Sequence, residues 1–306
     1  MAPSNTFAEA GTYLFARDVQ ERLTPNETQR NTLIVAGVYV VVIGILWHVP
    51  YLNKLLYPFK YVAMSHAFAG LLTCAKIHSI ELDPDEGGVT TMKGGVACIT
   101  LPAGYLGSSF IGACLIACGF NTNASKVASI IMAIFFLFTL WWARRNWLTW
   151  VLILGMSGLI VVFWFVAGSI ALRFFVLFIG VMSCLYCLWD IIDDTLARKV
   201  NTSDASVFAE RFGCCPSKVW GFIWLVQAFI FFGVGVLVGL VAFKQDVDQQ
   251  KVDSSNFLAV PSAKSSGVAL WTHTSNLFVW CTLICASLST PIWISHDYRR
   301  TCDAML

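Results

Sequence analysis

Long apolar runs separated by short polar stretches dominate this chain. A helix needs about 20 apolar residues to cross a bilayer. Six regions approach that length: 33–50, 97–120, 127–143, 147–167, 171–189 and 219–243. Two further regions are less regular, because 61–76 is short and carries His66, and 268–294 is interrupted by polar residues. The pattern predicts an all-α polytopic membrane protein with seven to eight transmembrane helices.

The polar stretches between these runs indicate how the chain is organised. Residues 1–32 form a polar N-terminal segment, residues 33–243 hold the main membrane domain, and the Ser-rich stretch 244–267 is typical of a flexible linker. Residues 268–306 would then supply an extra transmembrane helix and a tail. Near 78–95, alternating polar and apolar residues around Asp-Pro and Gly-Gly predict a small β-hairpin.

The distribution of Lys and Arg bears on orientation, because cytosolic loops of membrane proteins carry an excess of them. If every run crosses once, the larger share falls on the side of the N-terminus, which is then cytosolic. If 61–76 dips into the membrane without crossing, every later helix reverses its direction. The sequence leaves both arrangements open.

Composition agrees with a membrane location. Hydrophobic residues make up 57% of the 306 residues and charged residues only 12%, whereas soluble domains carry about 25% charged residues. The net charge of +2 says nothing about partners, and the lack of a Lys/Arg-rich run argues against a nucleic-acid partner. We expect an integral, multi-pass membrane protein whose partners are membrane lipid and a transmembrane substrate or partner helix.

A histidine in an apolar run is the first candidate for chemistry. His66 lies in "MSHAFAG", and an ionisable residue in a membrane segment is a functional-site hypothesis by default. A zinc site on a helix needs a second ligand one turn away, yet the positions one turn from His66 are Val62, Ala63, Ala69 and Gly70. The motif His-Glu-x-x-His occurs nowhere in the chain. A metal ligand and a neutral, hydrogen-bonded histidine both remain open.

Acidic residues at the end of the run 171–189 are the second candidate. The stretch "DIIDD" begins at Asp190 and continues to Asp193 and Asp194. Carboxylates at the C-terminus of a helix are electrostatically unfavourable, so their position needs a reason. That reason is either a metal or ion site or a solvated helix end.

Three motifs in a fixed order carry a family resemblance: "SIELDPDEGG", "LPAGYLGSS" and "DIIDDTLARKVNTSDAS". Together they resemble the site-2-protease-type membrane zinc metallopeptidases, in particular the M50B-like group found in fungi and bacteria, over about 31–243. The resemblance implies a hydrolase that cuts membrane-embedded substrates with a zinc-activated water. In that family a helix with the pattern "HEFxHAxAG" supplies two histidine ligands and a water-polarising Glu, and an acid from a later helix is the third ligand.

The chain matches only the second half of that histidine pattern. "SHAFAG" aligns His66 with the second histidine, and the "HEF" triplet is absent. The best matches to the third ligand are Asp190 and then Asp193. The resemblance thus implies metal ligands at these three positions and assigns no catalytic residue. Zinc is the cofactor of the family and doubtful in this chain, which has the features of a pseudoenzyme; a splicing or gene-model artefact would give the same sequence.

Two other functions fit the same residues. A non-catalytic scaffold that binds partner helices would keep the fold and not need the missing triplet. A transporter or channel would use His66 and Asp190 in a proton or ion path, although the sequence shows no internal symmetry of the kind common in transporters.

Overall fold

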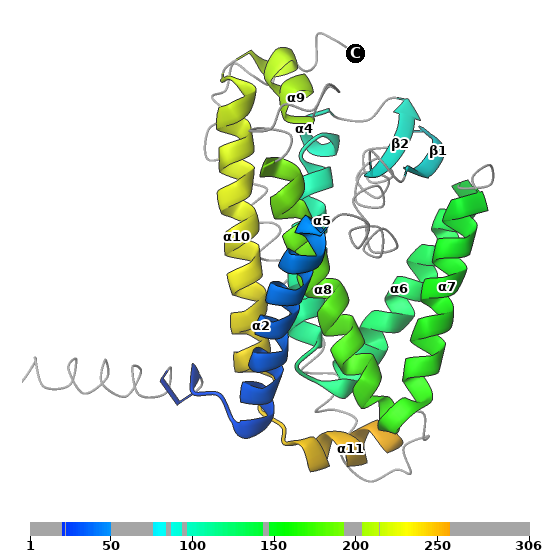
Figure 1. Ribbon diagram of the computed structural model, residues 1–306, viewed down its shortest axis with the longest axis vertical. Coiled ribbons are helices and arrows are strands. Elements are labelled where there is room, and N and C mark those ends of the chain that lie inside the picture. The colour runs from blue at the N-terminus through cyan, green and yellow to red at the C-terminus, as the bar shows by residue number, and fades with distance from the viewer. Residues whose placement is uncertain are drawn as a thin grey trace, which may run out of the picture. The chain divides into compact units, whose positions relative to one another are not determined.

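The computed structural model describes residues 20–21, 23–49, 76–83, 87–93, 97–142, 147–192, 204–213 and 215–257, and it is mostly helical (Figure 1). All of these residues belong to one compact unit, Met1–Ala259, whereas a second unit, Val260–Leu306, lies outside the described residues. Two of the candidate ligands, His66 and Asp193, also lie outside them.

The first long helix, α2 (Glu27–His48), begins where the sequence changes from polar to apolar. The Asn26 side chain accepts a hydrogen bond of 2.8 Å from the Gln29 backbone N–H, and the Gln29 side chain accepts one of 3.1 Å from the Asn26 N–H. This capping box satisfies donors that the first helical turn leaves without partners. The helix therefore starts at a defined residue.

Three helices form the interior of the unit: α5 (Ala103–Cys118), α8 (Ile170–Ile192) and α10 (Ser217–Ala242). α5 and α8 meet at Gly112 and Gly180, where a Cβ on Gly180 would lie 2.7 Å from the backbone N of Ile116. A Cβ on Gly235 of α10 would lie 2.6 Å from the carbonyl oxygen of Ala113. Glycine at these positions lets the helix backbones approach closely, which is how helices associate in a membrane.

Contacts along α8 fix the directions of α2 and α5. Trp47, at the end of α2, contacts Trp189, near the end of α8, with ring centroids 5.6 Å apart. The carbonyl oxygen of Tyr105, near the start of α5, accepts a hydrogen bond from Cys187 Sγ, also near the end of α8. The chain therefore leaves α2 and enters α5 at the same end of α8. This does not fit the assumption that every run crosses once, and it is the arrangement expected if 61–76 does not cross.

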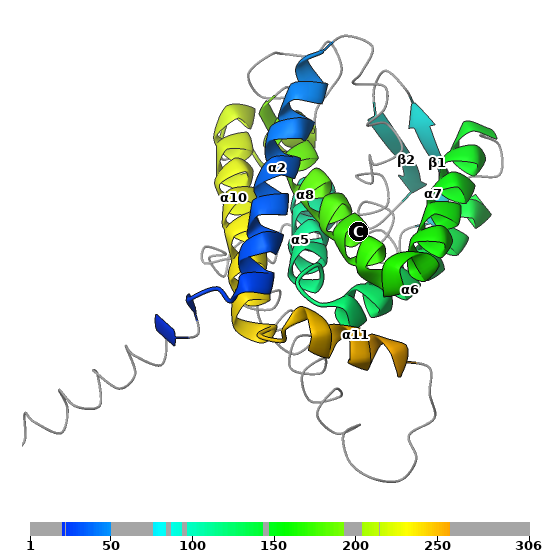
Figure 2. The ribbon, with the colours of Figure 1, turned by 60° about the horizontal axis from the view of Figure 1, so that its bottom comes forward.

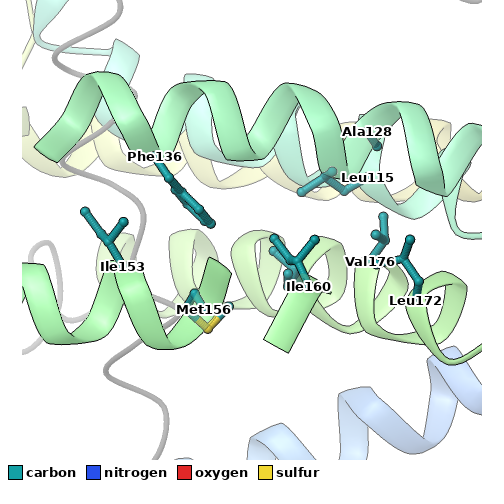
Figure 3. Close-up of a cluster of buried hydrophobic side chains, with 9 residues drawn as sticks. Leu115, Ala128, Phe136, Ile153, Met156, Ile160, Leu172 and Val176 are labelled. Carbon is teal, nitrogen blue, oxygen red and sulfur yellow. The ribbon is translucent and has the colours of Figure 1, made fainter. Parts of the chain in front are cut away.

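Two further helices, α6 (Thr122–Trp142) and α7 (Trp147–Phe165), pack against α8. A buried apolar cluster joins Phe136 of α6, Ile153 of α7 and Leu172 of α8, together with neighbours on the same helices (Figure 3). The cluster holds α6 and α7 beside the first half of α8.

The turn between α7 and α8 is a short 3-10 helix, η2 (Val166–Ser169). Ala167 and Gly168 have φ values of 51° and 63° there, in the left-handed region, where a right-handed helix does not continue. The chain reverses at this point. The reversal explains why the apolar stretch Thr149–Ile192, at 44 residues, is about twice as long as one bilayer crossing needs.

The hairpin expected near 78–95 is present. Strands β1 (Lys76–Asp83) and β2 (Gly87–Lys93) pair antiparallel, with one irregularity in register after Ile77. β1 contacts both α6 and α7. The short helix α4 (Ala97–Thr100) then leads to α5.

The polar stretch after α10 contains a helix, α11 (Val247–Ser255), which lies across the end of the unit where α10 finishes (Figures 1 and 2). Asp246 caps its start, and Gln250 is buried on its inner face. Of the linker expected at 244–267, residues 244–257 are described, and most of them are helical. The rest of the expected linker lies outside the described residues.

Four stretches of the described chain are long and apolar enough to cross a membrane: Glu27–His48, Thr122–Trp141, Thr149–Ile192 and Ser217–Ala242. Large apolar side chains on these helices are exposed, such as Leu137 at 69% and Phe165 at 79%. In water an exposed apolar surface of this kind would promote aggregation, whereas in a bilayer it faces lipid. The structure thus supports a helical membrane protein, and the runs expected at 61–76 and 268–294 lie outside the described part.

Candidate functional site

Asp190 is the candidate ligand that the structure describes, and it lies in the last turn of α8. It follows Leu172 by eighteen residues, or about five helical turns, so the two residues share one face of the helix. Leu172 is buried against α6 and α7 on that face. Asp190 is half-buried. The Asp190 carboxylate therefore lies on the same face of α8 as Leu172. Near the start of α8, that face packs against α6 and α7.

Hydrogen bonds to α5 fix the rotation of α8 near Asp190. Ser183 Oγ donates to the carbonyl oxygen of Ser108 at 3.0 Å, and Cys187 Sγ donates to that of Tyr105 at 2.9 Å. Both bonds satisfy polar hydrogens where a membrane offers no water. Because they come from the two turns before Asp190, they also determine the direction in which its side chain leaves the helix.

A small helix, α9 (Asp204–Phe212), packs against the same end of α8 and against α10. Phe208 of α9 lies against Trp220 and Trp224 of α10, with ring centroids 4.7 Å and 5.5 Å apart. Ile191 of α8 belongs to the same buried cluster. The residue beside Asp190 is thus anchored in a rigid aromatic core, which restricts movement of this helix end.

A histidine that the sequence analysis did not single out lies close to this end of α8. The ring of His48, the last residue of α2, contacts the ring of Trp189 with centroids 4.8 Å apart. Its Nδ1 lies 2.7 Å from the Gly44 carbonyl oxygen. Because a carbonyl oxygen only accepts, Nδ1 is the donor in this contact. The only feature of the sequence that could have indicated His48 is its position as an ionisable residue at the end of the apolar run 33–50.

The described residues do not assemble a metal centre. Among them no group of three or more His, Cys, Asp and Glu side chains lies close enough to hold an ion. Cys184 and Cys187 are buried thiols whose hydrogens point to carbonyl oxygens of α5. Of the three ligands that the sequence predicts, Asp190 alone is described, and no catalytic step through a metal follows from it.

Comparison with known proteins gives one result. No curated protein and no solved structure matches the chain. A family model described as Peptidase M50B-like matches residues 36–235, from α2 through most of α10. The matched range includes the candidate ligands and all of the helices that position Asp190, and the family is a group of zinc metallopeptidases. Because the match covers more than half of the chain, this protein belongs to the peptidase M50B-like family.

Proposed function

We propose that this chain is a membrane-embedded metallopeptidase-like protein that has lost peptidase activity. The observation that carries the proposal is the sequence "MSHAFAG" around His66, in which the first histidine and the glutamate of the zinc-binding pattern are missing. The family membership supports the membrane metallopeptidase fold, and the missing triplet supports the loss of activity.

The chemistry explains why the triplet is decisive. A catalytic zinc site uses three protein ligands and keeps a fourth position for water. His66 and Asp190 would supply two ligands, and Asp193 the nearest replacement for a third. Even then the glutamate that the family pattern supplies to accept a proton from a metal-bound water would be missing, because it is absent from the sequence before His66. Such a site would hold zinc weakly and would activate water poorly.

The missing triplet also changes the geometry of the helix that carries His66. Three residues correspond to about 300° of rotation and 4.5 Å of rise in an α-helix. Side chains on the N-terminal side of His66 would therefore point in a different direction around the helix than the corresponding side chains of a relative that keeps the triplet. This shift is a second physical reason to expect that the site of an active relative is not reproduced.

Zinc content tests the proposal directly. We expect the purified full-length chain, saturated with zinc and then freed of excess metal, to retain well under one zinc per chain. A chain with His-Glu-Phe inserted between Met64 and Ser65 should retain close to one. The matched control is an insertion of three alanines at the same place, which restores length and rotation without the ligands, and which should stay near the value of the unmodified chain.

The outcome that contradicts the proposal is equally specific. If the unmodified chain holds about one zinc and loses it in the His66→Ala variant, this chain binds the metal with ligands other than the missing triplet. In that case it is to be treated as a zinc peptidase. If neither the unmodified chain nor the chain with His-Glu-Phe binds zinc, the assignment of His66 as a ligand is wrong.

We further propose that the described helices α2, α5, α6, α7, α8 and α10 all cross the membrane, with the end of α8 on the cytosolic side. Because the end of α2 lies at the end of α8, this orientation puts the start of α2 on the opposite side and reverses the cytosolic N-terminus expected if every run crosses. The connections at that end carry Arg144, Arg145, Arg211 and Lys218, and cytosolic loops are enriched in such residues. An epitope inserted between Arg144 and Arg145 should be digested by protease added to sealed vesicles with their cytosolic face outward. Protection of that epitope would reverse the orientation.

A further inference from the structure

Helix α10 carries one amide in an otherwise apolar sequence. From Gly221 to Ala242, Gln227 is the only residue whose side chain contains an oxygen atom. It lies near the middle of the 26-residue helix. The side chain is partly exposed, and no hydrogen bond joins it to any described residue.

An amide in this position is unfavourable for an isolated chain. The middle of a bilayer contains no water, so a polar group that finds no partner in the protein keeps its hydrogen-bonding capacity unused. Each such group costs several kcal/mol in hydrocarbon. Polar side chains in membrane helices therefore bond to other helices wherever one is within reach. Among the residues that the structure describes, no helix supplies Gln227 with a hydrogen-bond partner.

Two faces of α10 can be distinguished by their spacing. The inner face packs on α5, α8 and α9, and its buried members are Gly221, Trp224, Ala228, Phe231, Gly235 and Gly239. The outer face contains Gln227 and follows alternating steps of four and three residues: Ile223, Gln227, Ile230, Val234, Leu237 and Val241. Ile223, Ile230 and Leu237 are 44%, 53% and 50% exposed. This second spacing is that of a helix–helix seam.

The amide itself indicates what covers this seam. A glutamine side chain both donates and accepts hydrogen bonds, so two glutamines can satisfy each other. In a two-fold symmetric pair, the same residue of each chain can meet at the axis. We propose that α10 forms the interface of a homodimer in which Gln227 of one copy hydrogen-bonds to Gln227 of the second. A single polar residue in an apolar seam also fixes the register of the two helices.

Subunit counting in lipid vesicles tests the dimer. Fluorescently labelled full-length chain is reconstituted at decreasing protein-to-lipid ratio, and photobleaching steps give the number of chains per particle. We expect dimers, and we expect Gln227→Leu to weaken dimerisation roughly tenfold, the size of one interhelical hydrogen-bond pair in a membrane. Gln227→Asn, which keeps the amide, should recover part of the affinity. Phe229→Leu, about 160° away around the helix, should change nothing.

Photocrosslinking gives a second measurement that leaves Gln227 in place. A photoreactive residue replaces Ile230 on the proposed seam or, as the control, the neighbouring Phe229, which leaves the helix about 100° away from Ile230. The proposal requires adducts between two copies of this chain from position 230 and far fewer from position 229. A wild-type chain that stays monomeric, a dimer indifferent to Gln227→Leu, or adducts from position 230 only to lipid or to a different polypeptide would each overturn it.

Discussion

Nη1 of Arg173, on α8, donates a hydrogen bond of 3.0 Å to Oε1 of Gln250, on α11. Arg173 is only 4% exposed, and its Nη2 donates to Thr32 Oγ1 of α2. The same Oε1 accepts hydrogen bonds from the backbone N–H and the hydroxyl of Thr122, at 3.2 Å and 3.1 Å. One glutamine amide therefore joins α6, α8 and α11 around a buried guanidinium.

Replacement of this amide should loosen α11. Gln250→Leu leaves a buried guanidinium N–H and the Thr122 donors without their acceptor, and each unsatisfied buried group costs about 1–3 kcal/mol. We expect a lower melting temperature and faster hydrogen exchange across α11. Lys251→Ala, on the exposed side of the same helix, is the control and should stay within about 0.5 kcal/mol of the wild type. Equal effects of the two changes would show that the amide does not hold the helix.

The partnership with Arg173 can be isolated in a double-mutant cycle. Arg173→Met removes the buried guanidinium, so Gln250→Leu in this background no longer leaves a guanidinium N–H without its acceptor. Gln250→Leu should then cost less in the Arg173→Met background than in the wild type. We expect a coupling energy of about 1–3 kcal/mol, in the range of contacting residues, from unfolding curves in detergent. Additive effects would show that the two side chains are independent.

This network also marks the limit of what the sequence could predict. Six of the eight apolar runs correspond to described helices, because a membrane helix needs a long apolar stretch, and the alternation near 78–95 indicated the hairpin. The polar stretch after α10 was interpreted as a linker because nothing local shows that Gln250 meets Thr122 and Arg173. Those contacts join residues more than 70 positions apart, and their polar side chains look identical in sequence to solvated ones.

For charged residues at helix ends, too, the sequence does not distinguish buried side chains from exposed ones. Lys126 and Arg173 lie at the ends of apolar runs, where the sequence indicates exposed loop charges, yet both are buried at the end of the unit beneath α11. The ammonium of Lys126 donates to the carbonyl oxygen of Ser254 at 2.8 Å and lies 5.5 Å from the ring centroid of Trp164. Similarly, the sequence indicates Asp190 as a candidate but not His48. Only the parallel packing of α2 on α8 brings His48 to the end of α8 where Asp190 lies.

Close packing between α5 and α8 predicts a sharp contrast between two glycines. In Gly180→Ala the new Cβ would lie 2.9 Å from the carbonyl oxygen of Gly112 and closer still to α5 backbone, so the helices must separate. We expect a loss of about 1–3 kcal/mol, typical of overpacking. In Gly158→Ala on α7 the Cβ meets nothing within 4 Å, and better helix propensity should stabilise by up to about 1 kcal/mol. Melting temperatures in one detergent compare the two.

A hydrogen bond between α2 and the start of α11 should make stability depend on pH. Thr28 Oγ1 donates to Asp246 Oδ1 at 2.8 Å, and this bond, with that from the Val247 N–H, holds the pKa of Asp246 below its ordinary value of 3.8. A carboxyl whose pKa is lowered by folding stabilises the fold above its unfolded pKa, and the contribution disappears as the pH falls through the folded pKa.

The matching variant is Thr28→Val, which removes the donor and keeps the shape. We expect it to lower the melting temperature at pH 7 and to differ less from the wild type as the pH falls through the lowered pKa of Asp246, where the carboxyl takes up a proton. Because other carboxyls titrate in both proteins, the difference between the two melting temperatures is the quantity to follow. A difference that stays constant while the pH falls from 7 until both chains unfold in acid would show that the bond does not depend on the charge of Asp246.

The role of Asp190 can be tested only where the missing ligands are restored. In the chain with His-Glu-Phe inserted before Ser65, a third ligand completes the zinc site, and Asp190→Ala should reduce retained zinc to a small fraction of that of the parent insertion chain. Asp248→Ala removes a carboxylate whose side chain is 89% exposed on α11 and should leave the zinc content unchanged. If Asp190→Ala also leaves it unchanged, the third ligand is a different acid. Asp193→Ala in the same background would then be the next variant to lose the metal, because Asp193 is the next acidic residue after Asp190 in the sequence.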